Sequence, residues 1–377
     1  MSDSPCARHH TAAMIATCHS GLAPQQLKGQ VLTRLRRVVP ADAVWWATCD
    51  PATLLFTQAY REGIPERTTP YFISNEFLAD DVNKWAELAR DPAGVRSLAQ
   101  ATAGELDASP RYREVFQPLG MADELRAALR AGGACWGLMC LHRETGRLFT
   151  GWEARYLQRL APHLAEGMRA GLLAAAAGDA ATPDAPGLVI LDQAGDMAAA
   201  TEPARAWLAE LGHDRHAALP LPAEVYAVAA RLRSLTQAGD PAASVPRLRV
   251  RTRSGRWAVL HAAWLQPPAE THDDPPGQIA VIIETAAPAE VASMIMHAYR
   301  LTAQERTVTG LVCRGLSTIQ IAARLCVSPY TVQDHLKSVF TKTGVRSRRE
   351  LVATIFRQHY LGPASQGRPV GPTGFFT

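Results

Sequence analysis

A short stretch near the C-terminal end, VSPYTVQDHLKSVF (327–340), combines an apolar stripe with a face rich in hydrogen-bonding groups. Four apolar side chains recur with helical spacing and are predicted to lie in a core: Val332, Leu336, Val339 and Phe340. The opposite face presents an amide, a carboxylate, an ammonium and hydroxyls: Gln333, Asp334, Lys337, Ser338 and Thr341. Such groups match base edges, because amides pair with adenine, carboxylates accept from cytosine amines, and cations donate to guanine.

Three further short helices are predicted around this stretch, and each begins at a residue that can cap it. Capping side chains are expected at four places: Thr302 with Glu305, Ser317, Ser328, and Ser347 with Glu350. Pro329 follows Ser328 at the first helical position, where its missing N–H is harmless. Four short helices, with a tight turn between the middle pair, describe a helix-turn-helix module.

The charge of the chain is concentrated in the same module. Residues 296–360 hold ten Lys or Arg against three Asp or Glu, a net charge of +7. The whole chain carries +4, so the remaining residues carry −3. A small basic module on a mildly acidic body indicates a polyanionic partner for the module.

The segment from Leu301 to Val352 resembles the C-terminal DNA-binding domain of LuxR-type transcriptional regulators. Residues in register with that family include Thr302, Glu305, Gly315, Ser317, Ile321, Leu325, Ser328, Thr331, Val332, His335, Lys342, Gly344 and Arg348. The resemblance implies that the recognition helix is 329–342 and that the partner is double-stranded DNA. The predicted DNA-contacting residues are Ser317, Ser328, Thr331, Gln333, Asp334, His335, Lys337, Thr341, Lys342, Arg346 and Arg348.

Within that set, the resemblance implies different roles. Base edges are expected to meet Gln333, Asp334 and Lys337, whereas phosphates are expected to meet Thr331, Lys342, Arg346 and Arg348. For His335, which flanks the apolar stripe, packing and a phosphate hydrogen bond remain alternatives. Many relatives carry Lys at the position of Gln333, and the adjacent Asp334 further weakens the local positive field. We therefore expect modest affinity per monomer, supplemented by homodimerisation.

The region before residue 287 is predicted to form two domains of mixed strands and helices. The expected elements of the first domain are a helix at 25–39, strands at 43–50 and 54–60, a strand pair at 124–144 and a helix at 152–173. The closing strand and helix resemble a GAF domain. The second domain, with strands in 187–200, 247–265 and 277–285 and a helix near 204–211, resembles a PAS-like domain in strand order. Both resemblances imply sensing of small molecules or dimerisation.

The predicted fold class is therefore α+β multidomain: two antiparallel α+β sensor-like domains followed by an all-α four-helix helix-turn-helix domain. A chain of 377 residues with 47% hydrophobic residues can bury several cores. The expected boundaries are 1–173 for the GAF-like domain, 174–186 for a linker, 187–286 for the PAS-like domain, 287–300 for a connecting helix, 301–361 for the helix-turn-helix domain and 362–377 for a disordered tail.

Two features of the first domain bear on a small-molecule site. Four tryptophans are most simply core residues, although a ligand pocket among them stays open: Trp45, Trp46, Trp136 and Trp152. Asn83-Lys84, Phe116 and Asp123-Glu124 resemble part of a cyclic-nucleotide signature of some GAF domains, but their spacing is wrong for it.

The chain is predicted to be a transcriptional regulator and not an enzyme. None of the four lysines follows a glycine, so a Gly-Lys-Ser/Thr phosphate loop is absent, as are His-Glu-x-x-His and Gly-x-Ser-x-Gly. The N-terminus lacks the pattern of a signal peptide and no apolar run is long enough for a membrane span, so a cytoplasmic location without membrane contact is expected. RNA polymerase is a further expected partner, and no cofactor is identified. The alternative is a ligand-binding or protein-interaction adaptor whose helix-turn-helix does not read DNA.

Overall fold

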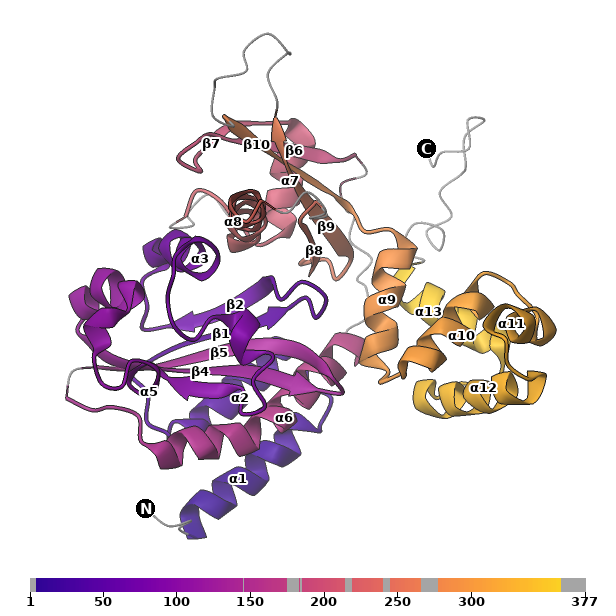
Figure 1. The fold of residues 1–377 in the computed structure, drawn as a ribbon, viewed down its shortest axis with the longest axis horizontal. Coiled ribbons are helices and arrows are strands. Elements are labelled where there is room, and N and C mark those ends of the chain that lie inside the picture. The colour runs from indigo at the N-terminus through magenta and orange to yellow at the C-terminus, as the bar shows by residue number, and fades with distance from the viewer. Residues whose placement is uncertain are drawn as a thin grey trace. The chain divides into compact units, whose positions relative to one another are not determined.

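The computed structural model describes residues 5–144, 146–174, 183, 185–213, 219–239, 245–265 and 277–360. The predicted tail at 362–377 and most of the predicted linker at 174–186 lie outside the described residues. The chain divides into two compact units, of which the first holds two β-sheets and the second holds the helices from residue 286 onward (Figure 1).

The first unit begins with a five-stranded antiparallel sheet in the order β2-β1-β5-β4-β3. Its strands are β1 (Ala43–Cys49), β2 (Phe56–Glu62), β3 (Val95–Ser97), β4 (Met121–Ala131) and β5 (Ala134–Glu144). The long hairpin of β4 and β5 turns at Gly132 and Gly133, whose φ angles of 59° and 77° lie in the left-handed region that favours glycine. The strands predicted at 43–50 and 54–60 and the strand pair predicted at 124–144 are confirmed.

Helices cover this sheet on both faces (Figure 1). One face carries α1 (Pro5–Cys18), α2 (Pro24–Leu35) and α6 (Gly151–Ala174), and α3 (Thr69–Leu78) lies over the other. The shorter helical segments are η1 (Glu66–Thr68), α4 (Trp85–Leu88), α5 (Leu98–Ala101), η2 (Leu106–Ala108), η3 (Tyr112–Phe116) and η4 (Gln117–Leu119). The helix predicted at 152–173 is α6, and its Met168 packs so closely on Gly137 of β5 that a Cβ at that position would clash with the Met168 sulfur.

A second five-stranded sheet completes the first unit, in the order β7-β6-β10-β9-β8. Its elements are β6 (Gly187–Leu191), β7 (Met197–Ala200), α7 (Glu202–Glu210), α8 (Ala223–Gln237), β8 (Arg247–Arg251), β9 (Trp257–Leu265) and β10 (Gln278–Thr285). Counted along each domain, both sheets have the same strand order: second, first, fifth, fourth, third. Helix α8 contacts α3 and β2 of the first domain as well as β8 and β10 of its own.

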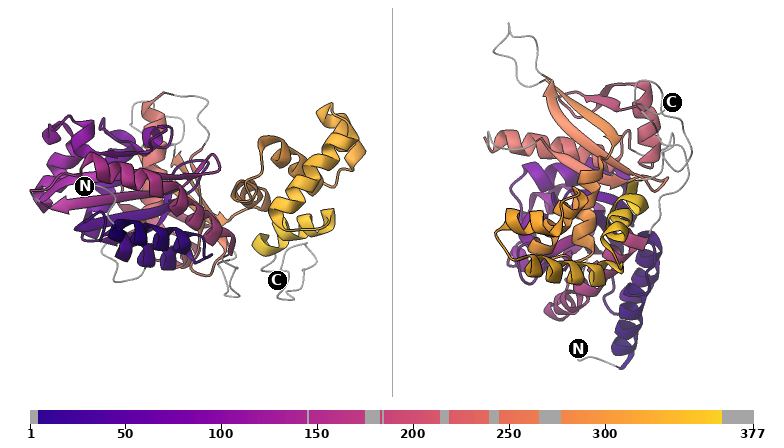
Figure 2. Two further views of the ribbon diagram at one scale, coloured as in Figure 1. Left: turned by 90° about the horizontal axis from the view of Figure 1, so that it is seen from below. Right: turned by 90° about the vertical axis from the view of Figure 1, so that its right-hand side faces the viewer.

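In the second unit, the described residues from 286 onward form five helices: α9 (Pro288–Ala298), α10 (Ala303–Cys313), α11 (Thr318–Leu325), α12 (Pro329–Thr343) and α13 (Arg348–Tyr360). Figure 2 shows these helices packed around one another. One core joins them, with buried residues Leu301, Val308, Leu311, Val312, Ile321, Ala322, Val332, Leu336, Val339, Leu351 and Ile355. Met296 and Tyr299 pack against this core, so the segment at α9 contributes to the same module.

The predicted fold class is confirmed: two antiparallel sheets with helices precede a helical C-terminal domain. In the described parts of the chain, no helix combines the length and the apolarity that crossing a membrane would require.

Candidate functional site

Helix α12 is held by a cap at each end and by one buried face. The hydroxyl of Ser328 accepts from the backbone N–H of Thr331 at 3.0 Å, which starts the helix as predicted. Gly344 ends it with a φ of 71°, in the left-handed region. Between these caps, Val332 and Val339 are fully buried, so the opposite face of α12 is turned outward.

The outward face of α12 carries the three predicted base-reading side chains, Gln333, Asp334 and Lys337. They are exposed, as is Thr341, another predicted DNA contact. The ammonium of Lys337 lies 3.6 Å from the carboxylate of Asp334, one turn away on the same helix. Exposed pairs of this kind are weak, so both groups are free to exchange their partner for a base or a phosphate.

Tyr330 also belongs to the outward face, although sequence analysis did not single it out. Its side chain is 68% exposed, and the ammonium of Lys337 lies 6.0 Å from the centre of its ring. Tyr330 and Lys337 are seven residues, or about two helical turns, apart, so they lie on the same side of α12. This spacing could have placed Tyr330 on the outward face from the sequence alone.

Ser338 does not share the outward face, so its predicted exposure was wrong. Its hydroxyl donates to the Glu305 carboxylate of α10 at 2.7 Å, and the Lys342 ammonium binds the same carboxylate at 2.6 Å. Glu305 also accepts the backbone N–H of Thr302, which completes the predicted capping box. The phosphate contact predicted for Lys342 stays a prediction. The structure adds that the Lys342 ammonium is already bound to Glu305.

Arg348 and Ser317 together hold the start of α11. The Arg348 guanidinium donates to the hydroxyl of Thr318 at 3.1 Å and to the carbonyl oxygen of Leu316 at 2.6 Å. Ser317 and Gln320 cap this helix reciprocally, in a box that the sequence analysis recognised only in part. The phosphate roles predicted for Arg348 and Ser317 therefore compete with structural ones.

The remaining predicted residues lie at the margins of the outward face. His335 is half-buried and Arg346 is exposed. At the start of α13, Ser347 caps the N–H of Glu350 at 3.2 Å, as expected. The Glu350 carboxylate, however, accepts the N–H of Arg346 at 2.7 Å instead of the N–H of Ser347. Of the two bonds in the predicted capping box, the one from Ser347 to Glu350 is therefore the one that forms.

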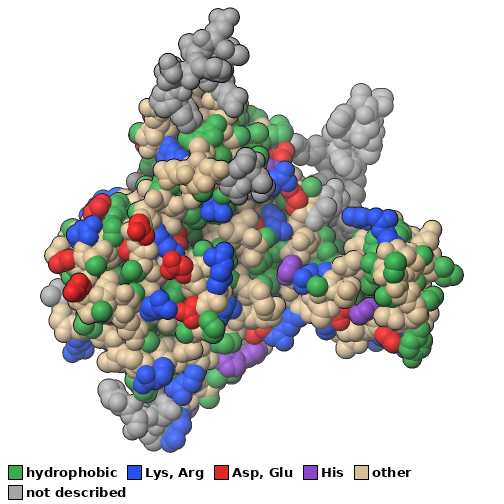
Figure 3. Space-filling view, viewed as in Figure 1, with side chains coloured by type: hydrophobic (Ala, Val, Ile, Leu, Met, Phe, Trp, Pro, Cys, Tyr) green, Lys and Arg blue, Asp and Glu red, His purple; other side chains and the backbone are tan. Residues whose placement is uncertain are grey.

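Charge on the first unit is mixed. On the face in Figure 3, its Lys and Arg side chains lie among Asp and Glu side chains. This agrees with the uneven charge of the sequence, in which the surplus of cations falls within residues 296–360.

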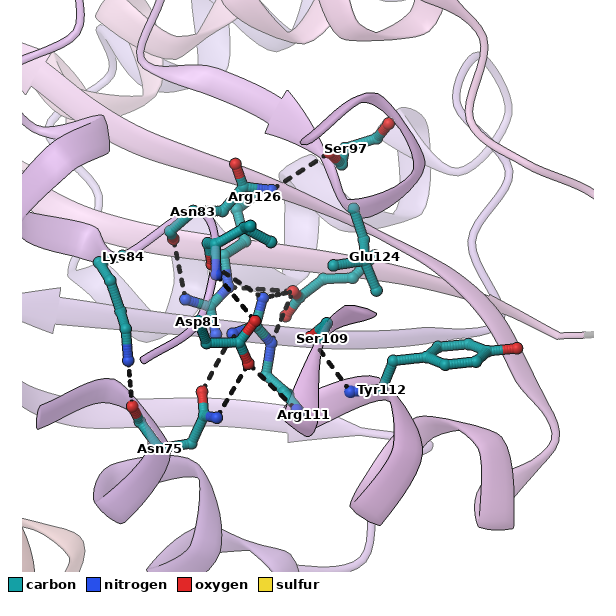
Figure 4. A network of polar contacts seen from close by, with 12 residues as sticks. Asn75, Asp81, Asn83, Lys84, Ser97, Ser109, Arg111, Tyr112, Glu124 and Arg126 are labelled. Atoms are coloured by element: carbon teal, nitrogen blue, oxygen red, sulfur yellow. Dashed lines mark hydrogen bonds and ion pairs between the residues drawn. The ribbon is translucent and has the colours of Figure 1, made fainter. Parts of the chain in front are cut away.

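A buried ionic network lies between α3 and the first sheet (Figure 4). Arg111, fully buried, donates to Glu124 of β4 at 3.1 Å, to Asn75 of α3 at 3.1 Å and to Asp81 at 3.2 Å. Burial raises the pKa of Glu124, but the guanidiniums of Arg111 and Arg126 outweigh it and hold this pKa at about 2. The carboxylate is therefore ionised across the physiological range.

Arg126 extends this network toward the aromatic residues of the domain. It donates to Glu76 of α3 at 2.9 Å and to the carbonyl oxygen of Asn83 at 3.1 Å. Its guanidinium also lies over the ring of Trp85, 4.6 Å from the ring centre. Three members of the mis-spaced signature, Asn83, Lys84 and Glu124, thus meet in one structural network, which the linear spacing did not reveal.

The C-terminal module is similar in sequence to segments of known transcriptional regulators. Residues 299–355 match the bacterial regulatory proteins of the luxR family. An HTH-type transcriptional regulator of Mycobacterium bovis is 56% identical over 52 residues, which cover 14% of this chain and 6% of that protein. The monoamine regulon transcriptional regulator of Klebsiella aerogenes is 47% identical over 53 residues, or 14% of this chain and 23% of that protein. The chain thus spans less than a quarter of either relative.

Residues 29–168 match the GAF domain. Among solved structures, Escherichia coli SdiA aligns with 92% of this chain and 96% of its own, at 10% identity and a TM-score of 0.31. A TM-score of this size does not show a common fold. On the two family matches, this chain carries a GAF domain and, C-terminal to it, a helix-turn-helix domain of the luxR family of bacterial regulatory proteins.

Proposed function

We propose that the chain is a sequence-specific transcriptional regulator that binds double-stranded DNA as a homodimer, under the control of its N-terminal sensor domains. A small-molecule effector acts on those domains, RNA polymerase is a downstream partner, and the protein works in the cytoplasm. The second domain, 187–286, serves as a PAS-like sensor. The domain boundaries follow those expected from the sequence, with the DNA-binding domain at 301–361.

The observation that carries this proposal is the outward face of α12. A helix anchored by Val332 and Val339 presents Gln333, Asp334 and Lys337 together, in a module with a surplus of cations. These three side chains offer the groups that match adenine, cytosine and guanine edges in a major groove. The family match of the same residues to luxR-type regulators supports it.

One observation favours the alternative, an adaptor whose helix-turn-helix does not read DNA. Lys342 is bound to Glu305, and Arg348 is bound to Thr318 and to the backbone of Leu316. Fewer cations then remain for phosphates. The salt dependence of duplex binding separates the two functions. A regulator that contacts DNA phosphates releases counterions from the DNA, so its affinity falls as salt rises, whereas an adaptor that makes no phosphate contacts shows no such dependence.

Two single variants of α12 test the DNA-reading function. Lys337→Ala should lower affinity for all duplexes and flatten the slope of log affinity against log salt by about 0.9, the contribution of one contact. Asp334→Ala should leave non-specific binding equal or tighter, because it removes a negative charge and releases Lys337. It should also reduce discrimination at one base position by about 1–3 kcal/mol, through loss of a bond to a cytosine amine.

The measurement is competition binding of the full chain against duplexes selected from genomic fragments and varied at each position. Thr307→Ala, on the exposed surface of α10, is a control that should change neither the slope nor the base preference. Binding that does not respond to salt would reject the regulator in favour of the adaptor. An unchanged base preference in Asp334→Ala would show that Asp334 is a solvated surface residue.

A further inference from the structure

Two buried cysteines of the first sheet lie next to each other, Cys49 at the end of β1 and Cys135 near the start of β5. The two strands pair antiparallel, and Thr48 lies opposite Gly137 at this end of the pairing. The next residue of β1, Cys49, therefore faces β5 close to Cys135. Both cysteines are free thiols, and neither has a part in the proposed reading of DNA.

A β-bulge in β5 changes the face of the sheet on which the Cys135 side chain lies. In the pairing of β4 with β5, Arg130 lies opposite Cys135. The preceding residue of β4, Leu129, lies opposite Gly137, so Trp136 is an extra residue in β5. Because side chains alternate between the two faces of a strand, one extra residue moves Cys135 from the face of Gly137 to the opposite face.

This opposite face is the one on which the Cys49 side chain lies. Gly137 belongs to the α6 face, where Met168 packs against it. Cys49 and Cys135 belong instead to one hydrophobic core with Trp85 of α4. The Cys49 thiol donates to the backbone carbonyl oxygen of Cys135 at 3.3 Å, and the two thiols lie within hydrogen-bonding reach of each other.

The spacing of the two strands suits a covalent bond between these sulfur atoms. Facing residues of antiparallel strands have Cα atoms about 4.5–5.5 Å apart, and a disulfide spans about 4.4–6.8 Å between Cα atoms. The bulge therefore leaves the thiols of Cys49 and Cys135 where a disulfide can form between them.

Cys135 is the more reactive thiol of the pair. The hydrogen bond from Cys49 lowers the pKa of Cys135 more than burial raises it, and the Arg130 cation lowers it further. The Arg130 guanidinium donates to the carbonyl oxygens of Ala89 at 3.0 Å and Pro92 at 2.9 Å, and no ion pair neutralises it among the described residues. The hydrogen bond to Cys135, together with burial, raises the pKa of Cys49.

Cys135 also borders an open cleft at the end of the sheet. The cleft has a volume of about 590 Å³ and is lined by the turn of the β4–β5 hairpin, the loop after β1, the segment after α4 and one side of α6. Hydrogen peroxide takes up about twice the roughly 30 Å³ of one water, so the cleft admits it. A small oxidant can thus approach Cys135 from this side.

Other cysteines of the chain lack this arrangement. Burial raises the pKa of Cys18 to about 12 and that of Cys313 to about 11, and it also raises the pKa of Cys140. In the part of the chain that the structure describes, none of these three thiols is hydrogen-bonded to another thiol. They are therefore expected to be inert core residues.

We propose that Cys49 and Cys135 form an oxidation site for hydroperoxides, at which the two thiols are converted to a disulfide. The reaction goes beyond the proposed function and does not depend on DNA binding. Cys135 is the attacking thiol, because it is acidified and borders the cleft. Cys49 is the resolving thiol, because it stays protonated and adjacent.

The reaction has two steps. The Cys135 thiolate attacks one oxygen of the hydroperoxide, an S–O bond forms, the O–O bond breaks, and the alkoxide or hydroxide that leaves takes up the proton released by Cys135. The Cys49 sulfur then attacks the resulting sulfenic acid, the S–S bond forms, and the hydroxyl leaves as water with the Cys49 proton. The peroxide gains the two electrons that the sulfur atoms lose.

Mass spectrometry of the full chain tests the reaction. The chain is reduced, freed of reductant and treated with a modest excess of hydrogen peroxide. Its mass should fall by about 2 Da, a dithiol reductant should reverse the change, and peptide mapping should place the link between Cys49 and Cys135. Cys49→Ser should stop at the sulfenic acid of Cys135, a gain of about 16 Da that dimedone labels, and Cys135→Ser should form no link.

A control and a rate comparison accompany these variants. Cys18→Ala, which removes another buried thiol of the same domain, should leave the link between Cys49 and Cys135 unchanged. The folded chain should form the link at least about tenfold faster than the same chain in urea, because the fold acidifies Cys135 and holds the two thiols together.

Three results would overturn the proposal: no loss of mass, a link mapped to other cysteines, or a rate in the folded chain no higher than in urea. Each would show that Cys49 and Cys135 only fill the core. If the serine variants do not fold, Cys49→Ala and Cys135→Ala, which keep apolar side chains in the core, repeat the comparison. The rate ratio of the unaltered chain decides the question without any variant.

Discussion

Glu305→Gln is predicted to destabilise the helix-turn-helix module, because Glu305 is the point at which α10 and α12 are tied together. Glu305 is 4% exposed, and its carboxylate accepts from the Thr302 N–H, the Ser338 hydroxyl and the Lys342 ammonium. Burial alone raises the pKa of this carboxyl. The bonds from Lys342, Ser338 and Thr302 outweigh burial and lower the pKa from 4.5 to about 2.

The size of the effect follows from that pKa. A fall from 4.5 to about 2 corresponds to roughly 3 kcal/mol of stability at neutral pH, at about 1.4 kcal/mol per unit. The side chain of Lys342 is 32% exposed, so solvent screens part of the interaction and about 1–2 kcal/mol is a better expectation. A glutamine keeps the shape of the Glu305 side chain and can still accept hydrogen bonds. The loss of stability in Glu305→Gln therefore measures the contribution of the negative charge.

The sign of the pH dependence gives a second readout. Because the folded-state pKa of Glu305 is depressed, its contribution is present above pH 4.5 and is lost as the pH falls from 4.5 toward 2. At pH 7 the unaltered module should therefore have a larger free energy of unfolding than the Glu305→Gln variant. The difference between the two should be smaller at pH 3. The Gln variant itself has no such titration at this position.

The assay is urea unfolding of residues 286–361, followed by far-ultraviolet circular dichroism at both pH values. Asp334→Asn, which removes an exposed carboxylate from the same module, is the control and should change stability by less than about 0.5 kcal/mol. Hydrogen exchange of α12 in the full chain gives the same comparison without truncation. A Gln variant as stable as the unaltered module at pH 7, or a difference that persists unchanged at pH 3, would refute the reasoning.

Two further predictions concern buried ionisable groups of the first unit. Burial lowers the pKa of Lys28 to about 7, so the folded chain binds fewer protons than the unfolded chain between pH 7 and 10.5 and gains stability as pH rises. Lys28→Met removes this pH dependence together with the bond to Gln58, so its urea midpoint relative to that of the unaltered chain should be higher at pH 7 than at pH 10. The same difference at both pH values would contradict this. Burial raises the pKa of Glu224, so the folded chain binds more protons above pH 4.5 and loses stability as pH rises through that window. Glu224→Gln should remove this loss and be equally or more stable at pH 7, which melting temperatures at pH 5 and pH 7 would check.

The helix-turn-helix module was the most predictable part of the chain, because the interactions that define its helices are local in sequence. The caps at Thr302, Ser317 and Ser328 lie within three residues of the N–H groups that they bind, and a helical stripe such as Val332, Leu336 and Val339 can be read directly. The prediction that failed in this module depended on an interaction between residues far apart in the sequence. Ser338 lies on a polar face by periodicity, but Glu305, 33 residues earlier, draws its hydroxyl inward.

Helix α8 was missed for a related physical reason. It is in contact with α3 and β2 on one side and with β8 and β10 on another, so apolar residues surround most of its circumference. Buried positions run consecutively from Ala227 to Ala230, which erases the stripe that marks an amphipathic helix. A helix that is buried on two sides shows no clear 3.6-residue period of apolar residues. The small residues of α8 do not indicate a strand either.

The ionic network around Glu124 was not predictable at all from the sequence. Its carboxylates and guanidiniums are spread from Glu76 to Arg126, and such residues are by default expected at the surface. Only the chain path, which brings α3, the segment at Asp81 and β4 together, makes Arg111 a buried residue with three side-chain partners.

Gln58 of β2 shows how the two sheet domains are joined. Its backbone has a φ of 28°, unfavourable for a residue with a side chain, beside the irregularity in the pairing of β1 with β2. Three bonds hold it: its carbonyl oxygen accepts from Lys28 at 2.9 Å, its N–H donates to Glu224 at 3.0 Å, and its side-chain amide donates to the Arg251 carbonyl at 2.9 Å.

A backbone conformation of this kind costs of order 1–3 kcal/mol, and three hydrogen bonds at about 1 kcal/mol each can offset it. The conformation of Gln58 therefore depends on groups from α2, α8 and β8 being in place together. Two of these groups, the Lys28 amine and the Glu224 carboxyl, are buried and ionisable, so placing a charge on either costs desolvation energy at this joint. We expect the second domain to follow changes in β2 through this residue as well as through the contact of α8 with α3, because α8 supplies both.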